Sequence, residues 1–369
     1  MRILHVYKSY WPVVGGIENH LRCLAEAQAA AGHDVTVLVT HAGLWSREEH
    51  INGVRVLRAG RVCTLASAPL SLSLPALLAR EHPDITHLQF PYPVGEVAHW
   101  LFGAGRASVL SYQSDVVRQR RLLRLYRPLM ERVLGRVDRI LVSSPCYLES
   151  SSTLQAFRAK CRVVPLGIDQ RPFRDADAAR VQAIRAQYGP GPLLLFAGVL
   201  RYYKGLEYLL EAMPSIPARL LVAGEGPMGA EWRARAQALG LGDRAVFLGA
   251  VEDDELAALY KAASVFVLPS SERSEAYGLV LAEALSAGLP AVSTELGTGT
   301  SFVNRDGETG LVVAARDAGA LARGVNALLG DAALRNRLAR GALERAKAFE
   351  VAPMVQAIEA VYAEALERR

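Results

Sequence analysis

Residues 265–294 read VFVLPSSERSEAYGLVLAEALSAGLPAVST, and this stretch decides the fold. Two apolar runs, VFVLP (265–269) and AVST (291–294), have the composition of buried strands. Between them, a turn marked by Gly278 leads into an apolar helix. A strand, a helix and a second strand in this order predict a parallel sheet covered by helices.

Two glutamates lie on either side of the Gly278 turn: Glu275 comes before it, and Glu283 stands among apolar residues of the helix. The free N–H groups at a helix start favour a phosphate. At ~1.5 Å per residue, Glu283 lies roughly 7–8 Å along the helix axis. We expect a sugar, a diphosphate and a ribose to bind in this order from Glu275 to Glu283. Alternatively, Glu275 is a solvated acid near a helix dipole, whereas Glu283 needs a partner if it is buried.

The same alternation of strands and helices extends over most of the chain and predicts two Rossmann-like, doubly wound α/β domains. The first half has helical patterns at 17–31 and 115–134, and its expected strands are 3–7, 34–40, 54–59, 84–90, 107–113 and 139–144. In the second half the expected strands are 193–198, 219–224, 245–249, 265–269, 291–294 and 310–313. We place the connection near 163–173 and expect helix from residue 317 onward, which gives domains 1–167 and 168–350 and a final helical segment 351–369.

Bulk properties are those of a globular protein of two domains. The chain has 369 residues, 51% hydrophobic and 21% charged, which excludes a disordered chain. Four scattered cysteines, no signal-peptide pattern and no apolar run near the ~20 residues of a membrane span indicate a cytoplasmic protein. The net charge of +5 favours anionic partners. We expect no nucleic-acid partner.

Loops that follow strands supply the other candidate residues. In GVLRYYKG (198–205), Arg201 and Lys204 can converge on a diphosphate and offset the charge of a leaving group; the alternative is a basic turn in solvent. In the loop after the first strand, Gly15 and Gly16 allow a phosphate or a sugar to approach a helix start, although paired glycines also occur in ordinary turns.

A basic helix follows the segment YQSDVVRQ (112–119). Its arginines are interleaved with apolar residues: Arg118, Arg120, Arg121, Arg124, Arg127 and Arg132. Such a stripe either docks on an anionic membrane surface, at the inner face of the cell membrane, or is a solvated helix face. Asp115, which precedes the helix, either orients an acceptor hydroxyl or caps the helix.

The spacing of Glu275 and Glu283, together with Ala284, Gly288 and Pro290, forms E-x7-E followed by E-A-x-x-x-G-x-P. This pattern resembles retaining glycosyltransferase family 4, which has the GT-B fold of two domains facing across a cleft, and the resemblance covers nearly the whole chain. It implies that Glu275 contacts the donor sugar, Glu283 the ribose, and the amides of Gly278 and Leu279 the phosphate.

The resemblance implies further contacts and two departures. Backbone groups near Val251 meet the nucleotide base, and the last helix crosses back to the first domain. Val199 stands where relatives carry an arginine, so Arg201, two residues later, is expected to replace it. Gln113 stands where relatives often have histidine. It cannot titrate, so either no general base is needed at this position or that role lies elsewhere; glutamine is compatible with front-face attack in which the leaving phosphate oxygen takes the acceptor proton.

The sequence therefore predicts a metal-independent, retaining hexosyltransferase. Its donor would be a nucleotide-diphosphate sugar, with no other cofactor, and its acceptor a glycan or lipid-linked hydroxyl. The run GTGTSFVN (297–304) is similar to bacterial enzymes of surface-polysaccharide assembly, including lipopolysaccharide, which favours a mannose-type donor such as GDP-mannose. Two alternatives stay open: a nucleotide-sugar epimerase of GT-B shape, and a non-catalytic nucleotide-sugar-binding protein.

Two motifs point to other chemistry, and we set both aside. GEGPMG (224–229) fits a dinucleotide fingerprint but follows the second strand of its domain and contains Pro227. DAD (175–177) resembles a metal-binding D-x-D but lies in the expected linker. The eight histidines show no zinc-ligand spacing, so no metal site is expected.

Overall fold

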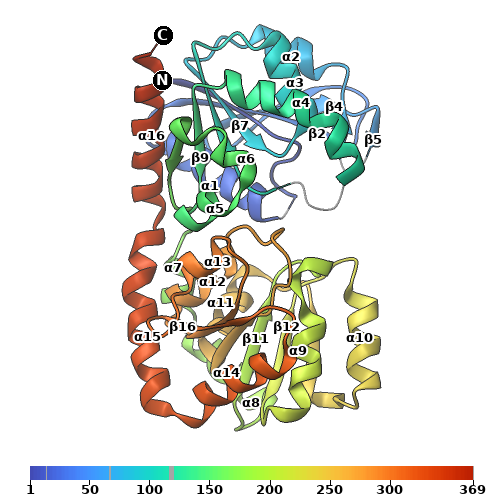
Figure 1. Ribbon diagram of the computed structural model, residues 1–369, viewed down its shortest axis with the longest axis vertical. Helices are drawn as coiled ribbons and strands as arrows, with labels where there is room; N and C mark the ends of the chain where they lie inside the picture. Colours follow the sequence, from blue (N-terminus) through green and yellow to red (C-terminus); the bar gives the residue numbers. More distant parts are fainter. Residues whose placement is uncertain (14, 66–67, 116–119, 369) are drawn as a thin grey trace. The chain divides into compact units, whose positions relative to one another are not determined.

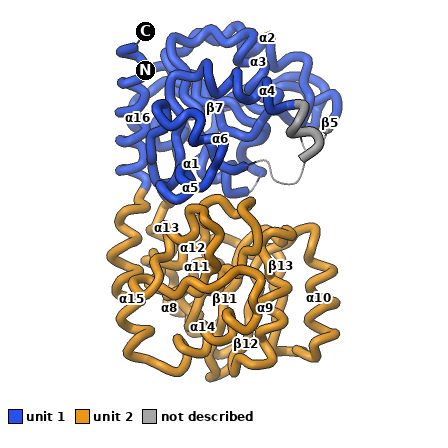
Figure 2. The backbone as a smooth tube through the Cα atoms, in the orientation of Figure 1, with its two compact units in different colours: residues 1–167, 351–369 blue, residues 168–350 orange. Residues whose placement is uncertain are grey.

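The computed structural model describes residues 1–13, 15–65, 68–115 and 120–368, and the chain divides into two compact units (Figure 2). Unit 1 comprises Met1–Gly167 and Val351–Arg369, and unit 2 comprises Ile168–Glu350. Each unit is a sheet covered by helices (Figure 1).

Unit 1 is built on an eight-stranded sheet in the order β10-β9-β8-β7-β1-β2-β4-β3. All its neighbouring strands are parallel except β3, which pairs antiparallel with β4 at the edge. The strands are β1 (Arg2–Val6), β2 (Asp34–His41), β3 (Arg47–Ile51), β4 (Val54–Gly60), β7 (Ile85–Phe90), β8 (Ala107–Tyr112), β9 (Arg139–Val142) and β10 (Cys161–Val163). A separate hairpin joins β5 (Cys63–Leu65) to β6 (Ala68–Leu70).

The central strands of unit 1 are apolar because helices cover the sheet. Every residue of β7 and β8 is buried, which is expected of parallel strands covered on both faces. The helices are α1 (Gly16–Ala30), α2 (Leu74–Arg80), α3 (Pro93–Phe102), α4 (Arg120–Arg136), α5 (Pro145–Ser150), α6 (Ser152–Gln155) and α16 (Val351–Leu366), with the 3₁₀ turn η1 (Arg158–Lys160).

The last helix, α16, belongs to unit 1 although it follows unit 2 in sequence. Its apolar residues Met354, Ile358 and Tyr362 pack in one core with residues of β1, β7 and β8. The Tyr362 hydroxyl lies 2.6 Å from Nδ1 of His87, and the guanidinium of buried Arg139 lies 2.7 Å from Glu364. Apolar packing and polar contacts together hold α16 on this sheet.

Unit 2 is built on a six-stranded, fully parallel sheet in the order β13-β12-β11-β14-β15-β16. The strands are β11 (Leu193–Ala197), β12 (Arg219–Ala223), β13 (Ala245–Gly249), β14 (Val265–Leu268), β15 (Ala291–Glu295) and β16 (Gly310–Ala314). The α-helices are α7 (Arg171–Arg174), α8 (Ala178–Tyr188), α9 (Leu206–Ala212), α10 (Gly229–Ala238), α11 (Asp253–Ala262), α12 (Leu279–Ser286), α13 (Thr300–Val303), α14 (Ala318–Gly330) and α15 (Ala332–Ala346). The 3₁₀ turns are η2 (Tyr202–Lys204), η3 (Met213–Ser215), η4 (Gly242–Arg244) and η5 (Lys347–Phe349).

The strand order of unit 2 reverses direction between β11 and β14. The chain runs outward from β11 to β13 and then restarts on the other side at β14. Loops leaving two such strands diverge at their carboxyl ends, which is where open α/β sheets bind ligands. The loops concerned are 198–205 and 269–278.

The expectation of unbroken helix after residue 317 is wrong at two places. Asp331 has extended backbone angles, and its side chain accepts a hydrogen bond from the Leu334 N–H at 2.9 Å, which starts α15. A second break at Glu350 separates η5 from α16. The structure also adds β3, β5, β6 and β10, short strands that lack a long apolar run.

Within the residues described, no helix is long and apolar enough to cross a bilayer.

Candidate active site

A buried ion pair joins the loops that follow β11 and β14. Lys204 ends η2 after β11, Glu275 follows β14, and Lys204 Nζ lies 2.6 Å from Glu275 Oε2. The side chains are 9% and 10% exposed, respectively. Glu275 is therefore not a solvated acid, and the alternative of a basic turn in solvent is wrong for Lys204 although Arg201 is exposed.

Several contacts hold the Glu275 segment in place. The Ser270 hydroxyl donates to Glu275 Oε2 at 3.1 Å, and the Thr298 hydroxyl donates to the Glu275 carbonyl at 2.8 Å. Gly299 approaches the Ala276 carbonyl so closely that a Cβ would lie 2.8 Å from it. The loop that starts at Gly297 therefore supports the Glu275 backbone.

The environment keeps Lys204 protonated. Burial by itself disfavours the ammonium, but the nearby Glu275 carboxylate, Tyr203 and Glu283 outweigh this and raise the Lys204 pKa. The positive charge is therefore present at neutral pH. Glu283 acts on Lys204 electrostatically, so both acids lie near the same cation.

Helix α12 begins four residues after Glu275, at Leu279. Gly278 has φ 79° and ψ 60°, a left-handed conformation that favours glycine, and it precedes the first helical residue, Leu279. The helix N-terminus supplies N–H groups beside Glu275, while Leu279 and Val280 are half-buried. An anion seated here would meet both the helix dipole and the Lys204 charge.

Glu283 has a partner that sequence analysis missed. The Tyr260 hydroxyl on α11 donates to Glu283 Oε2 at 2.7 Å and lies 3.3 Å from the Val280 carbonyl. Burial raises the Glu283 pKa, whereas the Tyr260 hydrogen bond and Lys204 oppose that rise. Tyr260 stands 23 residues from Glu283 in an apolar helix, so no local pattern pairs them.

Arg201 is exposed, in contrast to Lys204, and has extended backbone angles at the start of η2. Val199 is half-buried, and its carbonyl accepts from the Arg201 N–H at 2.8 Å. Because it is exposed, the Arg201 guanidinium can reach a ligand that enters from solvent, whereas the Lys204 ammonium, three residues later, is buried.

The glycines of residues 224–229 have a packing role. A Cβ on Gly224 would lie 2.1 Å from the Gly198 carbonyl oxygen, and one on Gly226 would lie 2.6 Å from Leu200 backbone atoms. The Leu200 N–H donates to the Glu225 carbonyl at 2.9 Å. These glycines let two loops lie backbone to backbone, which accounts for the G-x-G spacing without a dinucleotide.

Val251 lies in the adjacent loop, after β13, and is half-buried. The Gly224 N–H donates to the Gly249 carbonyl at 2.7 Å, which joins this loop to the previous one. The loops after β11, β12 and β13 therefore support one another at the carboxyl edge of the sheet.

Gly15 and Gly16 begin α1 in unit 1, and the Glu18 carboxylate folds back over them. A Cβ on Gly15 would lie 2.3 Å from Glu18 Oε2, and Ser9 donates to Glu18 Oε1 at 3.0 Å. Gly15 therefore makes room for an acid that already faces this helix start.

Gln113 and Asp115 follow β8. The Gln113 amide donates to Gln89 Oε1 at 3.0 Å. Asp115 Oδ1 accepts from the hydroxyls of Tyr112 at 2.9 Å and Ser151 at 3.1 Å. The proposed capping of a helix by Asp115 involves residues 116–119, which lie outside the described residues.

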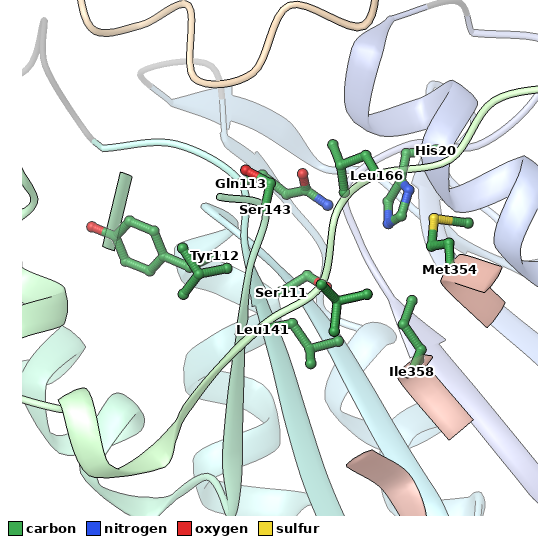
Figure 3. A pocket seen from close by; sticks show the side chains of 11 residues that line it. His20, Ser111, Tyr112, Gln113, Leu141, Ser143, Leu166, Met354 and Ile358 are labelled. Atoms are coloured by element: carbon green, nitrogen blue, oxygen red, sulfur yellow. The ribbon is translucent and has the colours of Figure 1, made fainter. Parts of the chain in front are cut away.

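A small pocket of unit 1 contains Gln113 together with His20, which sequence analysis did not select (Figure 3). His20 is 2% exposed, and neither ring nitrogen has a hydrogen-bond partner within the described part of the chain. Burial lowers its pKa to about 4, so the imidazole is neutral at physiological pH. Leu166, Met354 and Ile358 form apolar walls.

The structure describes only part of the basic stripe. Arg127 and Arg132 on α4 are exposed, and Arg127 pairs with Glu131 at 2.8 Å. Arg118 lies outside the described residues.

Across residues 1–13, 15–65, 68–115 and 120–368, no group of three or more histidine, cysteine, aspartate or glutamate side chains is arranged to hold a metal ion. In the DAD segment, the Asp177 side chain caps α8 by accepting from the Ala179 N–H at 2.9 Å.

Two family models match the chain: "Glycosyltransferase Family 4" over residues 14–171 and "Glycosyl transferases group 1" over residues 180–345. The chain is 42% identical to the D-rhamnosyltransferase WbpZ of Pseudomonas aeruginosa over 317 residues, 85% of this chain and 82% of that protein. It is 35% identical to the O-antigen chain mannosyltransferase C of Escherichia coli, with full coverage of both chains.

The fold is similar to that of a sucrose-phosphate synthase from Thermosynechococcus elongatus. The TM-score is 0.81 at 25% identity, and the match covers 100% of this chain and 99% of that one.

Proposed function

Because the chain belongs to glycosyltransferase family 4 and has the GT-B fold, we propose that this glycosyltransferase is a retaining hexosyltransferase that uses a nucleotide-diphosphate sugar. Its acceptor would be a hydroxyl of a lipid-linked glycan. The names of the relatives, a rhamnosyltransferase and an O-antigen chain mannosyltransferase, support a mannose-type donor. They also favour transfer over the epimerase and the binding-protein alternatives.

One observation carries the proposal: the Lys204–Glu275 pair joins the loops after β11 and β14, where the strand order reverses, and Glu275 lies just before the N-terminus of α12. A diphosphate bound there would meet an ammonium and several N–H groups. Both stabilise the negative charge that builds on a leaving diphosphate.

The remaining roles follow from position. Glu275 would contact the sugar through Oε1, because Oε2 is held by Lys204 and Ser270. Glu283 would accept hydrogen bonds from the ribose, and the backbone near Val251 would meet the base. Exposed Arg201 would close on the diphosphate. These cations supply the charge that a metal ion provides in other enzymes, so we propose that the reaction needs no metal and no further cofactor.

Acceptor chemistry is assigned to unit 1. Gln113 cannot take a proton, so the acceptor proton would pass to the leaving phosphate oxygen as that oxygen departs from the sugar carbon. Asp115 would orient the acceptor hydroxyl, and Gly15 and Gly16 would let the donor approach the backbone. We further propose that the enzyme acts on the cytoplasmic face of the cell membrane, with the α4 arginines near anionic lipid.

The decisive test measures donor binding and transfer together. Thermal shift with GDP-, UDP- and dTDP-sugars selects the donor, and transfer to a short-chain lipid-linked glycan is followed by NMR. The proposal expects stabilisation by one nucleotide class and a product that keeps the anomeric configuration of the donor. Free nucleotide with an isomerised sugar and no acceptor would indicate an epimerase; binding without turnover would indicate a binding protein.

A variant pair tests the role of Arg201. Lys204→Ala and Arg201→Ala should both slow transfer. The reduction in rate should be larger for Lys204→Ala, because Lys204 is buried. If Arg201→Ala turned over donor at the native rate, Arg201 would not replace the family arginine at position 199.

A further inference from the structure

Unit 1 displays four apolar side chains on neighbouring loops. Trp45 is 86% exposed, Leu72 85%, Leu44 73% and Val62 58%. Their loops follow β2, β4 and β6 and precede β3, β5 and α2. Isolated exposed apolar residues are common on proteins, but a group that includes a nearly bare tryptophan marks an interaction site.

Hydrogen bonds join these loops into one surface, which we call the Trp45 patch (Leu44, Trp45, Val62 and Leu72). The Arg61 N–H donates to the Gly43 carbonyl at 2.8 Å, and the Val62 N–H donates to the Leu70 carbonyl at 2.9 Å. The Ser46 hydroxyl donates to the Ser73 hydroxyl at 2.7 Å. The three segments are therefore adjacent in space.

The Trp45 loop is held in its exposed shape. The two nitrogens of the His41 ring meet the Trp45 carbonyl at 2.8 Å and the Gly43 N–H at 3.1 Å. A Cβ on Gly43 would lie 2.4 Å from the His41 ring, so a larger residue there would displace the ring that holds the loop. A loop that is ordered before binding loses less conformational freedom when a partner covers it.

The charges beside the patch are net positive. Arg47 is exposed, and Arg61 precedes Val62. The two acids of the following strand β3 are already paired: Glu48 with Arg55 at 3.0 Å, and Glu49 with Arg58. Within the described residues, neither Arg47 nor Arg61 forms an ion pair. Apolar side chains with such arginines at their edge are complementary to an anionic headgroup layer above hydrocarbon, and tryptophan favours that boundary.

We propose that the Trp45 patch docks on an anionic lipid bilayer. Leu44, Trp45, Val62 and Leu72 would enter the boundary between headgroups and acyl chains, with Arg47 and Arg61 among the headgroups. This inference rests on the proposed function in one respect: a lipid-linked acceptor would be presented at that surface. It assigns the hydrophobic anchoring to loops rather than to α4.

Vesicle co-sedimentation of the full chain tests the docking. The triple variant L44S/W45S/L72S should bind phosphatidylglycerol-containing vesicles at least ten-fold more weakly than the native chain. The matched control L101S/F102S changes two exposed residues at the end of α3, which leads to the opposite, amino edge of the same sheet, and it should bind normally. Equal vesicle binding by the native chain, the triple variant and the control overturns the proposal. Binding that is lost only in an R127S/R132S variant of α4 also overturns it.

Tryptophan quenching supplies an independent readout. Of the four tryptophans, Trp232 is fully buried, Trp11 is 37% exposed and Trp100 is half-buried, so Trp45 should dominate quenching by brominated lipids. W45F should remove most of that quenching. Unchanged quenching in W45F overturns the proposal. The proposal is also overturned if the native protein self-associates through the patch and does not bind vesicles.

Failure of this inference is distinguishable from failure of the proposed function. With a water-soluble, short-chain acceptor, the triple variant should transfer sugar at the native rate, because its changes lie outside the proposed donor and acceptor residues. Native transfer with no vesicle binding overturns the docking alone. Absence of transfer by the native chain with every donor and acceptor overturns the function alone.

Discussion

Lys204 Nζ lies 2.6 Å from Glu275 Oε2, at the point where the loops after β11 and β14 diverge. The two groups proposed to bind the donor are therefore bonded to each other before any donor arrives. A buried pair of this kind costs desolvation and is held only by close geometry. An incoming diphosphate can share the ammonium without moving it, because Lys204 has further N–H donors.

Removal of one partner should reveal that cost. Lys204→Met leaves the Glu275 carboxylate buried without its cation, which should lower the free energy of unfolding by about 3–5 kcal/mol. Transfer should fall by about 10²–10³-fold as the electrostatic contribution is lost. Urea unfolding and steady-state kinetics measure the two effects.

The double variant K204M/E275Q separates stability from activity. It should regain most of the lost stability, because no unpaired charge stays buried, yet remain inactive. Lys347→Met, which breaks an exposed pair with Glu344, is the control and should change stability by less than ~1 kcal/mol. Native activity in the double variant would contradict the proposed role of the pair.

Tyr260→Phe should weaken donor binding through Glu283. The Tyr260 hydroxyl lowers the Glu283 pKa, so its removal should raise that pKa and shift the acid limb of the pH profile of donor KM upward. Loss of a hydrogen bond to a charged group corresponds to roughly a 10–100-fold rise in KM. Tyr188→Phe, at a half-exposed tyrosine of the same unit, should leave KM and its pH profile unchanged. A pH-independent loss of kcat alone would argue against this assignment.

Gly226→Ala should disturb the loop that carries Lys204. The added Cβ would lie 2.6 Å from the Leu200 backbone, which cannot move as a side-chain tip can. Such overpacking typically costs about 1–3 kcal/mol and should also weaken donor binding. A Cβ on Gly191 meets nothing within 4 Å, so Gly191→Ala should be neutral in both thermal unfolding and donor titration. Indistinguishable behaviour of the two variants would show that the contact is not important.

Stability should depend on pH through Glu96. Burial raises its pKa to about 7, although hydrogen bonds from Tyr126 and the Tyr92 N–H oppose the rise. An ordinary glutamate titrates near ~4.3, so between these values the folded chain binds more protons than the unfolded one. Stability should therefore fall as pH rises through this window, by roughly 4 kcal/mol in total. Glu96→Gln should flatten this slope in urea unfolding between about pH 4 and pH 7; an unchanged slope would exclude Glu96 as its source.

The alternation of apolar runs with helical patterns was enough to predict two parallel α/β sheets, because buried parallel strands must be apolar on both faces. The E-x7-E spacing was enough to select Glu275 and Glu283, since it lies within one strand-loop-helix unit. Edge strands escaped prediction: β3 reads REEHI, and its polar residues face solvent. The glycines of 224–229 fit a dinucleotide fingerprint that sequence analysis set aside, and their distances to Gly198 and Leu200 show the packing role that the sequence could not.

The local sequence determined which segments become strands and helices, because secondary structure depends on residues a few positions apart. Strand order in the sheet decided that Lys204 meets Glu275 across 71 positions (275 − 204) and that Tyr260 reaches Glu283. The Trp45 patch likewise joins loops that lie apart in sequence. Burial and pairing depend on distances between elements that only the folded chain sets, because local patterns record what a residue is but not what lies opposite it.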